Sequence, residues 1–222
     1  MQHSGPKLSS VRHPNEVRRS KTPTPKSRSL LPRRSLDEHC FNSSASFYSL
    51  SATSITGHPY LFSQLQDKVV LIVNIATEDA TFSSHLHSLQ HFYTTYQDAG
   101  LVVLGFPCNQ FYQQPGTNKD ISHTLRHKFH VTFPVMSLSQ VNGSDTHAVY
   151  RWLKQNKRHS LGILIKWNFE KFLITRQGKI YKRYNFSIAA EDIEPDIAKL
   201  LQASANDEVE IPVSPQQYYK SL

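Results

Sequence analysis

The sequence predicts an α/β domain in which short buried strands alternate with amphipathic helices. Residues 69–75 and 101–104 are apolar runs rich in β-branched side chains, as in central strands that are covered on both faces of a sheet. Between these runs, apolar and aromatic side chains recur at helical spacing over residues 86–96, and Gly100 provides a C-terminal stop. A strand, a helix and a second strand in this order are typical of an α/β domain.

The rest of the domain continues this alternation. The predicted face of the first helix consists of Leu86, Leu89, Tyr93 and Tyr96. The further elements expected are a helix over 120–130, a strand over 133–136, a helix over 145–157 with Val149, Trp152 and Leu153 on its apolar face, a hairpin of 172–176 and 179–184, and a last helix that carries Ile193, Ile197, Leu200 and Leu201. This order is that of a thioredoxin-like fold, with a central mixed sheet flanked by helices.

A basic arm precedes the predicted domain. The first 36 residues contain nine Lys and Arg and one acidic residue, whereas the remainder has sixteen basic and sixteen acidic residues, so the net charge of +8 lies in the arm. Five prolines among the first 45 residues oppose any long helix there. We therefore expect a disordered arm over 1–45, one domain over 46–204 and a flexible tail over 205–222. The balanced charge of the domain argues against nucleic-acid binding through it.

Cysteine content and hydropathy favour an intracellular protein. Only two cysteines are present, Cys40 and Cys108, which argues against a disulfide framework and for a reducing compartment. No secretory apolar segment and no run long enough to span a bilayer occurs. We expect a cytoplasmic location, and the basic arm leaves a mitochondrial or a nuclear address open.

Two eight-residue segments carry a resemblance to a known family. They are residues 104–111, LGFPCNQF, and residues 166–173, KWNFEKFL, and shorter matches in register occur at 68–74, 131–135, 141–143 and 193–197. With these segments, the chain from about Phe47 to Leu201 resembles the glutathione peroxidase family. The resemblance implies a thioredoxin fold and a hydroperoxide-reducing protein of the oxidative-stress response. It also implies glutathione or thioredoxin as the reductant, and no metal or other cofactor.

The connection between the helix over 145–157 and Lys166 is short. Tetrameric members of the family carry a longer insertion there, so the chain is similar to the monomeric members that accept phospholipid hydroperoxides or use thioredoxin. We therefore expect a monomer whose partners, if it is active, are a hydroperoxide and a thiol reductant.

The resemblance also implies a set of site residues. In the family, a Cys or selenocysteine attacks the peroxide, and a Gln, a Trp and an Asn donate N–H groups that lower the pKa of this nucleophile and orient the peroxide. By position these helpers are Gln114, Trp167 and Asn168. The segment around Gln114 is one residue shorter than the family's usual stretch, so Gln113 remains an alternative to Gln114.

Both redox positions of the family have changed in this chain. The nucleophile falls on Asp79, and the resolving cysteine of the thioredoxin-dependent members falls on Leu125. A carboxylate cannot pass through a sulfenic state or form a disulfide, so the usual cycle has no first step. The resemblance therefore predicts a degenerate peroxidase with weak or absent activity, and a regulatory or scaffold role with a protein partner.

Two interpretations of Asp79 follow from the residue type. An Asp between a strand and a helix commonly serves as an N-cap, which stabilises the helix by about 1 kcal/mol and implies no further role. Alternatively, its carboxylate accepts hydrogen bonds from Trp167, Gln114 and Asn168 and imitates a sulfinate, so that the domain keeps an oxidised-like shape.

Cys108 offers an alternative function. It is the one thiol in the predicted domain, and it follows the second strand. A buried, inert thiol is the simple interpretation. If the thiol is accessible, Cys108 could serve as the nucleophile of an active peroxidase that reduces hydrogen peroxide or lipid hydroperoxides with glutathione or thioredoxin. Whether the chain is an enzyme is therefore left open by its sequence.

Histidines recur at helical spacing in two places. His123, His127 and His130 share one predicted stripe with Asp120 nearby, and His87 and His91 form a second i, i+4 pair. Such spacing is compatible with zinc or copper, but spacing alone is weak support for a site. We expect solvated polar faces and no metal.

Overall fold

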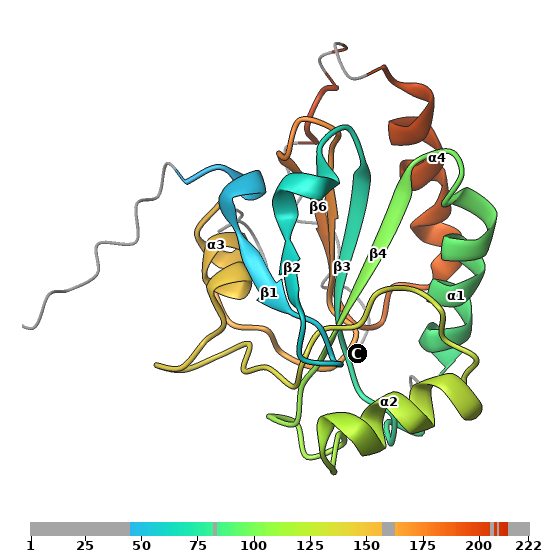
Figure 1. Ribbon diagram of the computed structural model, residues 1–222. Coiled ribbons are helices and arrows are strands. Elements are labelled where there is room, and N and C mark those ends of the chain that lie inside the picture. The colour runs from blue at the N-terminus through green and yellow to red at the C-terminus, as the bar shows by residue number, and fades with distance from the viewer. Residues whose placement is uncertain (1–44, 82–83, 157–162, 205–206, 208, 213–222) are drawn as a thin grey trace, which may run out of the picture. The chain divides into compact units, whose positions relative to one another are not determined.

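The computed structural model describes residues 45–81, 84–156, 163–204, 207 and 209–212. Its centre is a four-stranded mixed sheet in the order β4-β3-β5-β6 (Figure 1). The strands are β3 (Val69–Ile75), β4 (Leu101–Pro107), β5 (Lys171–Ile174) and β6 (Ile180–Tyr184). β3 pairs in parallel with β4 and antiparallel with β5, and β5 pairs antiparallel with β6. The mixed sheet and the hairpin of the thioredoxin-like prediction are thus confirmed.

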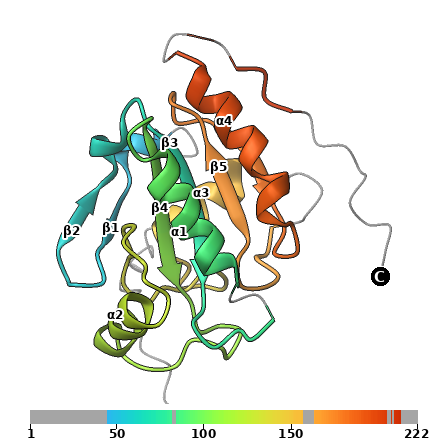
Figure 2. The same cartoon turned by 90° about the vertical axis from the view of Figure 1, so that its right-hand side faces the viewer.

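Helices cover both faces of this sheet. α1 (Ser84–Tyr96) and α4 (Glu194–Gln202) lie side by side on one face, and α3 (Ala148–Asn156) lies on the other (Figures 1 and 2). α2 (Asn118–His127) lies beyond the carboxyl ends of β3 and β4 (Figure 2). Alternate residues of β3 enter two apolar clusters, one shared with α1, α2 and α4 and one shared with α3. The central strand is therefore buried on both faces, as its apolar composition predicted.

A small hairpin lies outside the predicted elements. It consists of β1 (Ser51–Thr53) and β2 (Pro59–Leu61), which pair antiparallel. Three 3-10 helices accompany the larger elements: η1 (Phe47–Ser49), η2 (Phe62–Leu65) and η3 (Ala190–Asp192). Strands of three residues are too short to show a two-residue period, so no apolar pattern predicts this hairpin.

The strand predicted over 133–136 was wrong. Only two isolated bridges form there, Val135 with Gly105 and Met136 with Ser54. Pro134 has no N–H to donate and contributes only its carbonyl, which accepts from Gly105 N at 3.0 Å, and the pairing around it does not extend into a ladder.

Two predicted helix boundaries also shifted. α2 begins at Asn118 rather than at 120, because Thr117 and Asp120 form a capping box, and it ends at His127 rather than at 130. His130 has a φ of 54°, which is incompatible with a continuing right-handed helix. α3 begins at Ala148, three residues later than predicted. Among the described residues, no helix is long and apolar enough to cross a bilayer.

Arg176 joins three segments at the end of the sheet opposite α2. Its guanidinium donates to the carbonyl oxygens of Asp67, Ala99, Leu201 and Ala203, at 2.5, 3.1, 3.1 and 3.2 Å. These carbonyls belong to the turn before β3, the turn after α1 and the C-terminal end of α4. One rigid fork of N–H donors therefore replaces the partners that each segment would otherwise take from water.

We expect Arg176→Met to lower the free energy of unfolding by about 2–3 kcal/mol, because four carbonyl groups lose a charged donor together. Urea unfolding followed by circular dichroism measures this change. Lys179→Met, which removes an exposed cation from the same hairpin, is the matched control and should change stability little. Equal unfolding midpoints for the two variants would contradict this role of Arg176.

Lys171 is a buried cation in β5. Its side chain is 1% exposed, and its Nζ donates to the carbonyl oxygens of Ile188 and Phe186 at 3.2 and 3.3 Å. Burial lowers the pKa of Lys171 from 10.5 to about 7, and the neighbouring Glu170 carboxylate opposes this shift. The folded protein therefore releases this proton at a pH where the unfolded chain still holds it.

This difference makes stability depend on pH. Between about pH 7 and about pH 10 the unfolded state binds more protons at Lys171, so the free energy of unfolding rises with pH in this window. Relative to Lys171→Met, we expect the native protein to gain up to about 1.4 kcal/mol per pH unit. Urea unfolding of both proteins at several pH values tests this expectation, and parallel pH profiles would show that Lys171 keeps its ordinary pKa.

Candidate functional site

The site lies where β3 and β4 end. Because the two strands are parallel, their carboxyl ends meet at one edge of the sheet, and the segments that leave them are neighbours. The amide of Cys108, just after β4, donates to the carbonyl of Ile75 at 3.1 Å. Asp79 follows β3 by four residues and is 1% exposed. The nucleophile position of the resembled family is therefore an interior position at the edge of the sheet.

Two N–H groups donate to the Asp79 carboxylate. Trp167 Nε1 lies 3.2 Å from Asp79 Oδ2, and Asn168 Nδ2 lies 3.1 Å from the same oxygen. Both donors belong to the loop before β5. A buried carboxylate needs such partners, because leaving it without them would carry a large desolvation penalty. The structure thus brings together three of the residues predicted from the sequence: Asp79, Trp167 and Asn168.

Gln113 and Gln114 make different hydrogen bonds near Asp79. Gln113 Oε1 accepts from Asn168 Nδ2 at 2.6 Å, so Gln113 reaches the cluster that faces Asp79. Gln114 is fully buried, and its amide instead bonds twice to Thr77: Oε1 accepts from Thr77 N and Nε2 donates to Thr77 Oγ1, both at 2.9 Å. These two hydrogen bonds hold the backbone that leads to Asp79.

Backbone hydrogen bonds and ring packing fix the turn that contains Glu78 and the loop that contains Trp167. Glu78 N donates to the carbonyl of Gln113 at 3.1 Å. The rings of Phe111 and Trp167 lie 5.5 Å apart at 42°, and Tyr112, with a φ of 60°, is 93% exposed. The indole of Trp167 is therefore held between its hydrogen bond to Asp79 and the ring of Phe111.

Asp79 is not the N-cap of α1. The described helix begins at Ser84, and Thr81 lies in a turn. An N-cap directly precedes the first helical residue, so the position of Asp79 does not fit the simple capping interpretation.

His85 is a neighbour that sequence reasoning missed. It lies in the first turn of α1, and its ring stacks on Phe169 at 5.4 Å and 20°. Burial, together with the ammonium of Lys171, lowers the pKa of His85 from 6.5 to about 4, although the carboxylate of Asp79 opposes this shift. At neutral pH the imidazole is therefore uncharged. A single His in a helical segment carries no sequence signal for this proximity.

The two thiol positions of the sequence analysis are both interior. Cys108 is fully buried, and this burial raises the pKa of its thiol. Leu125, at the resolving position, is 1% exposed in α2 and packs in the cluster that also contains Ile121 and Phe129. Neither side chain faces solvent at the site.

The predicted histidine stripe is a surface feature of α2. The rings of His123 and His127 lie 4.3 Å apart, and both side chains are exposed. His130, just beyond the helix, is also exposed, while Asp120 accepts from Thr117 in the capping box. On α1, His87 packs against Phe129 and His91 against Phe92. Among the described residues, no group of three or more potential ligands is arranged to hold a metal ion.

Comparison with known proteins finds relatives of this chain in one family. The family model described as glutathione peroxidase matches residues 47–154. The glutathione peroxidase-like peroxiredoxin GPX5 of Chlamydomonas reinhardtii is 42% identical over 158 residues, which span 71% of this chain and 97% of that protein. The glutathione peroxidase-like peroxiredoxin HYR1 of Saccharomyces cerevisiae is 41% identical over 70% of this chain and 96% of that protein.

Solved structures show the same fold. The crystal structure of Trgpx in its apo form matches 72% of this chain and 98% of that chain, with a TM-score of 0.59 and 35% identity. A thiol:disulfide interchange protein of the thioredoxin family from Chlorobium tepidum shares the fold alone, with a TM-score of 0.55 and 14% identity. The thioredoxin-like prediction is thereby confirmed, and the chain belongs to the glutathione peroxidase family.

Proposed function

We propose that this family member has lost the peroxidase cycle and that Asp79 occupies the place of an oxidised nucleophile. The observation that supports this most directly is the pair of hydrogen bonds from Trp167 and Asn168 to a buried carboxylate. A peroxidatic thiolate and a carboxylate are both anions, so the same donors stabilise either group. The surroundings of a nucleophile are kept while the nucleophile is replaced.

The chemistry of residue 79 supports the loss. A thiolate attacks one peroxide oxygen, becomes a sulfenic acid and releases an alcohol or water. A carboxylate has no sulfur to oxidise. Its two oxygens resemble those of a sulfinate, which is the over-oxidised and inactive form of the family's nucleophile. In this proposal, Asp79 fixes the domain in a shape close to that inactive form.

The other redox positions are consistent with this proposal. Leu125 stands at the resolving position and packs in the apolar core. Cys108 is fully buried with a raised pKa, which opposes both access of a peroxide and formation of a thiolate at neutral pH. No observation favours Cys108 as the nucleophile of an active thiol peroxidase, and that alternative is tested below.

The proposed role is that of a binding module, regulatory or scaffolding, acting as a monomer on a protein partner. The disordered arm expected over 1–45 and the flexible tail expected over 205–222 lie mostly outside the described residues, and with the domain over 46–204 they stay predictions. Relatives named for the chloroplast and the mitochondrion occur in Arabidopsis thaliana. For this chain we propose a cytoplasmic location, and targeting by the basic arm to mitochondria or the nucleus is the alternative that localisation of the full chain would reveal.

We expect the purified protein to show no peroxide-dependent NADPH consumption above background when it is coupled to glutathione or to thioredoxin recycling. Asp79→Cys should gain activity by at least about tenfold over background, because the introduced thiol would meet the donors already present and ionise near neutral pH. Cys108→Ser is the matched control and should leave both results unchanged. Turnover by the unaltered protein that disappears in Cys108→Ser would instead assign the activity to Cys108.

We expect Asp79→Asn to lower the free energy of unfolding by about 1–3 kcal/mol. The substitution replaces a charged acceptor by a neutral amide. The NH2 group of this amide cannot accept a hydrogen bond from Trp167 or Asn168. Thermal unfolding measures the change. Glu78→Gln, the same kind of substitution at the exposed neighbouring residue, is the control. If Asp79→Asn alters stability no more than Glu78→Gln does, the imitation of an oxidised nucleophile is refuted.

A further inference from the structure

The two donors to Asp79 lie in a loop that lacks regular secondary structure. Trp167 and Asn168 belong to the described residues 163–170, between α3 and β5, where no strand or helix forms. Ile163 and Leu164 at its beginning are 58% and 61% exposed, whereas Ile165 and Phe169 are buried in the apolar clusters. The loop forms no backbone ladder, so polar side chains that bond to its backbone add to this apolar anchoring.

A buried ion pair between Glu170 and Arg183 holds this loop. Glu170 and Arg183 have side chains that are 1% and 2% exposed, and Arg183 Nη2 lies 2.5 Å from Glu170 Oε2. Arg183 Nε donates to the same oxygen at 2.9 Å. Arg183 lies on β6, where it is opposite Phe172 in the register of the hairpin, and its guanidinium packs over the Phe172 ring at 5.3 Å. Arg183 thus anchors the pair in the sheet, while Glu170 is the last residue of the loop.

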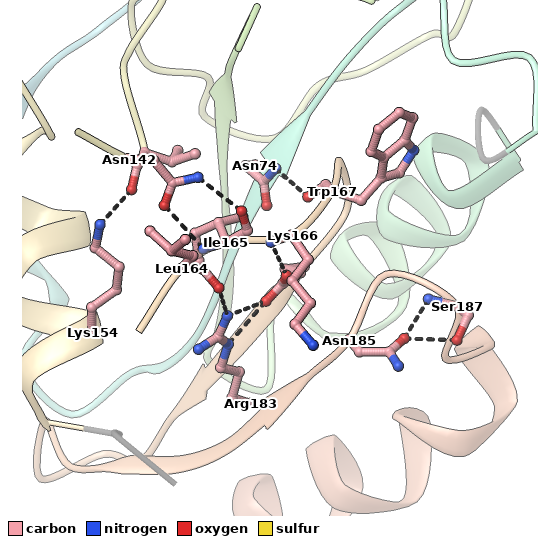
Figure 3. A network of polar contacts seen from close by, with 12 residues as sticks. Asn74, Asn142, Lys154, Leu164, Ile165, Lys166, Trp167, Arg183, Asn185 and Ser187 are labelled. Atoms are coloured by element: carbon pink, nitrogen blue, oxygen red, sulfur yellow. Dashed lines mark hydrogen bonds and ion pairs between the residues drawn. The ribbon is translucent and has the colours of Figure 1, made fainter. Parts of the chain in front are cut away.

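Both members of the pair also bond to loop backbone. Arg183 Nη2 donates to the carbonyl of Leu164 at 2.8 Å, and Glu170 Oε1 accepts from Lys166 N at 2.5 Å (Figure 3). The two bonded groups lie three residues and one residue before Trp167. The ion pair therefore fixes the backbone that carries the indole.

Asn74 and Asn142 also bond to the backbone of this loop. The side-chain amide of Asn74 in β3 donates to the carbonyl of Trp167 at 2.9 Å (Figure 3). The backbone carbonyl of Asn74 accepts from Phe169 N at 2.7 Å. Asn142 donates to the carbonyl of Ile165 at 2.8 Å and accepts from its N–H at 3.0 Å. Phe169 has a φ of 62°, which is costly for a bulky residue and is tolerated where surrounding contacts determine it.

We propose that Glu170 and Arg183 are positioning residues, which hold the 163–170 loop so that the N–H groups of Trp167 and Asn168 point at position 79. An apolar pair of similar volume would avoid the desolvation cost of two buried charges, and such replacements are often neutral or stabilising. An apolar pair could not, however, bond to Lys166 N and to the carbonyl of Leu164. The meaning of this position for function rests on the proposed role of Asp79, whereas the positioning itself can be measured independently.

The two tryptophans of the chain provide separate reporters in one spectrum. Trp167 Nε1 donates to Asp79, and Trp152 Nε1 donates to the carbonyl of Ala45 at 2.7 Å, away from the loop. In a ¹H–¹⁵N spectrum of the full-length protein, Trp167→Phe assigns the two indole signals. Asp79→Ala then gives the position of the Trp167 signal without its acceptor.

We expect Arg183→Met and Arg183→Lys both to move the Trp167 indole signal toward its position in Asp79→Ala, while the Trp152 signal stays in place. Lys cannot bridge Glu170 and the carbonyl of Leu164 with one planar group, so conserving the charge should not restore the signal. Lys182→Met is the matched control. Lys182 precedes Arg183 on β6 and forms an ion pair at 2.8 Å with Asp196 of α4, and neither residue belongs to the loop. This variant should move neither indole signal.

Two results would overturn the proposal. One is an unchanged Trp167 signal in folded Arg183→Lys and in folded Glu170→Gln. The other is movement of both indole signals together, which would indicate a general loss of structure. If Arg183→Met fails to fold, Arg183→Lys and Glu170→Gln, which keep the volume of the side chains, decide the question.

A second measurement separates this inference from the proposed function. In the Asp79→Cys background, we expect Arg183→Lys to lower the rate of alkylation of the introduced thiol at neutral pH by about tenfold, which corresponds to about one pKa unit. An unchanged rate would refute positioning toward residue 79. The indole signal could move as expected while Asp79→Asn has no effect on stability. That result would support the positioning role of Glu170 and Arg183 and refute the imitation of an oxidised nucleophile by Asp79.

Discussion

The site depends on the burial of β3 along its whole length. All seven residues of this strand are buried, with β4 and β5 on its two sides and an apolar cluster on each face. The chain that leaves the strand is therefore fixed by packing, and Asp79 is placed beneath the surface four residues later. Burial makes the residue type at this position matter, because an acidic group removed from water requires donors. Trp167 and Asn168 supply them.

Under the proposed function, this arrangement accounts for loss of the family's chemistry without loss of the fold. The donors around position 79 stabilise an anion, and they do not select between a thiolate and a carboxylate. Replacing one with the other keeps the hydrogen bonds while it removes the atom that peroxide oxidises. The elements that hold the donors, namely the Asn74 and Asn142 contacts and the ion pair of Glu170 with Arg183, do not touch residue 79 in the contacts described.

Much of the fold followed from periodicity. The strand over 69–75, the helix with Leu86 and Leu89 on its inner face and the β5–β6 hairpin all have clear apolar patterns, and the structure contains them. The β1–β2 hairpin escaped prediction because its strands have three residues each. The strand expected over 133–136 failed because Pro134 cannot donate to a ladder.

The site was predictable only in part, and for a different reason. Asp79, Trp167 and Asn168 came from the family resemblance, which places residues by position along the chain. Whether Gln113 or Gln114 reaches Asn168 depends on how the backbone turns at Tyr112, and neighbouring residues of one type cannot be distinguished by composition. His85 and Arg183 are also brought near the loop by tertiary packing between elements far apart in sequence. No local pattern marks such contacts.

The central claim is that the Asp79 carboxylate takes the place of an oxidised nucleophile. A crystal structure of Asp79→Cys, treated with peroxide until the introduced thiol becomes a sulfinate, tests it most directly. The claim predicts that the sulfinate oxygens superpose on those of the Asp79 carboxylate in the native protein and accept the same two hydrogen bonds from Trp167 Nε1 and Asn168 Nδ2. A sulfinate turned away from both donors, or a displaced Trp167 loop, would contradict it.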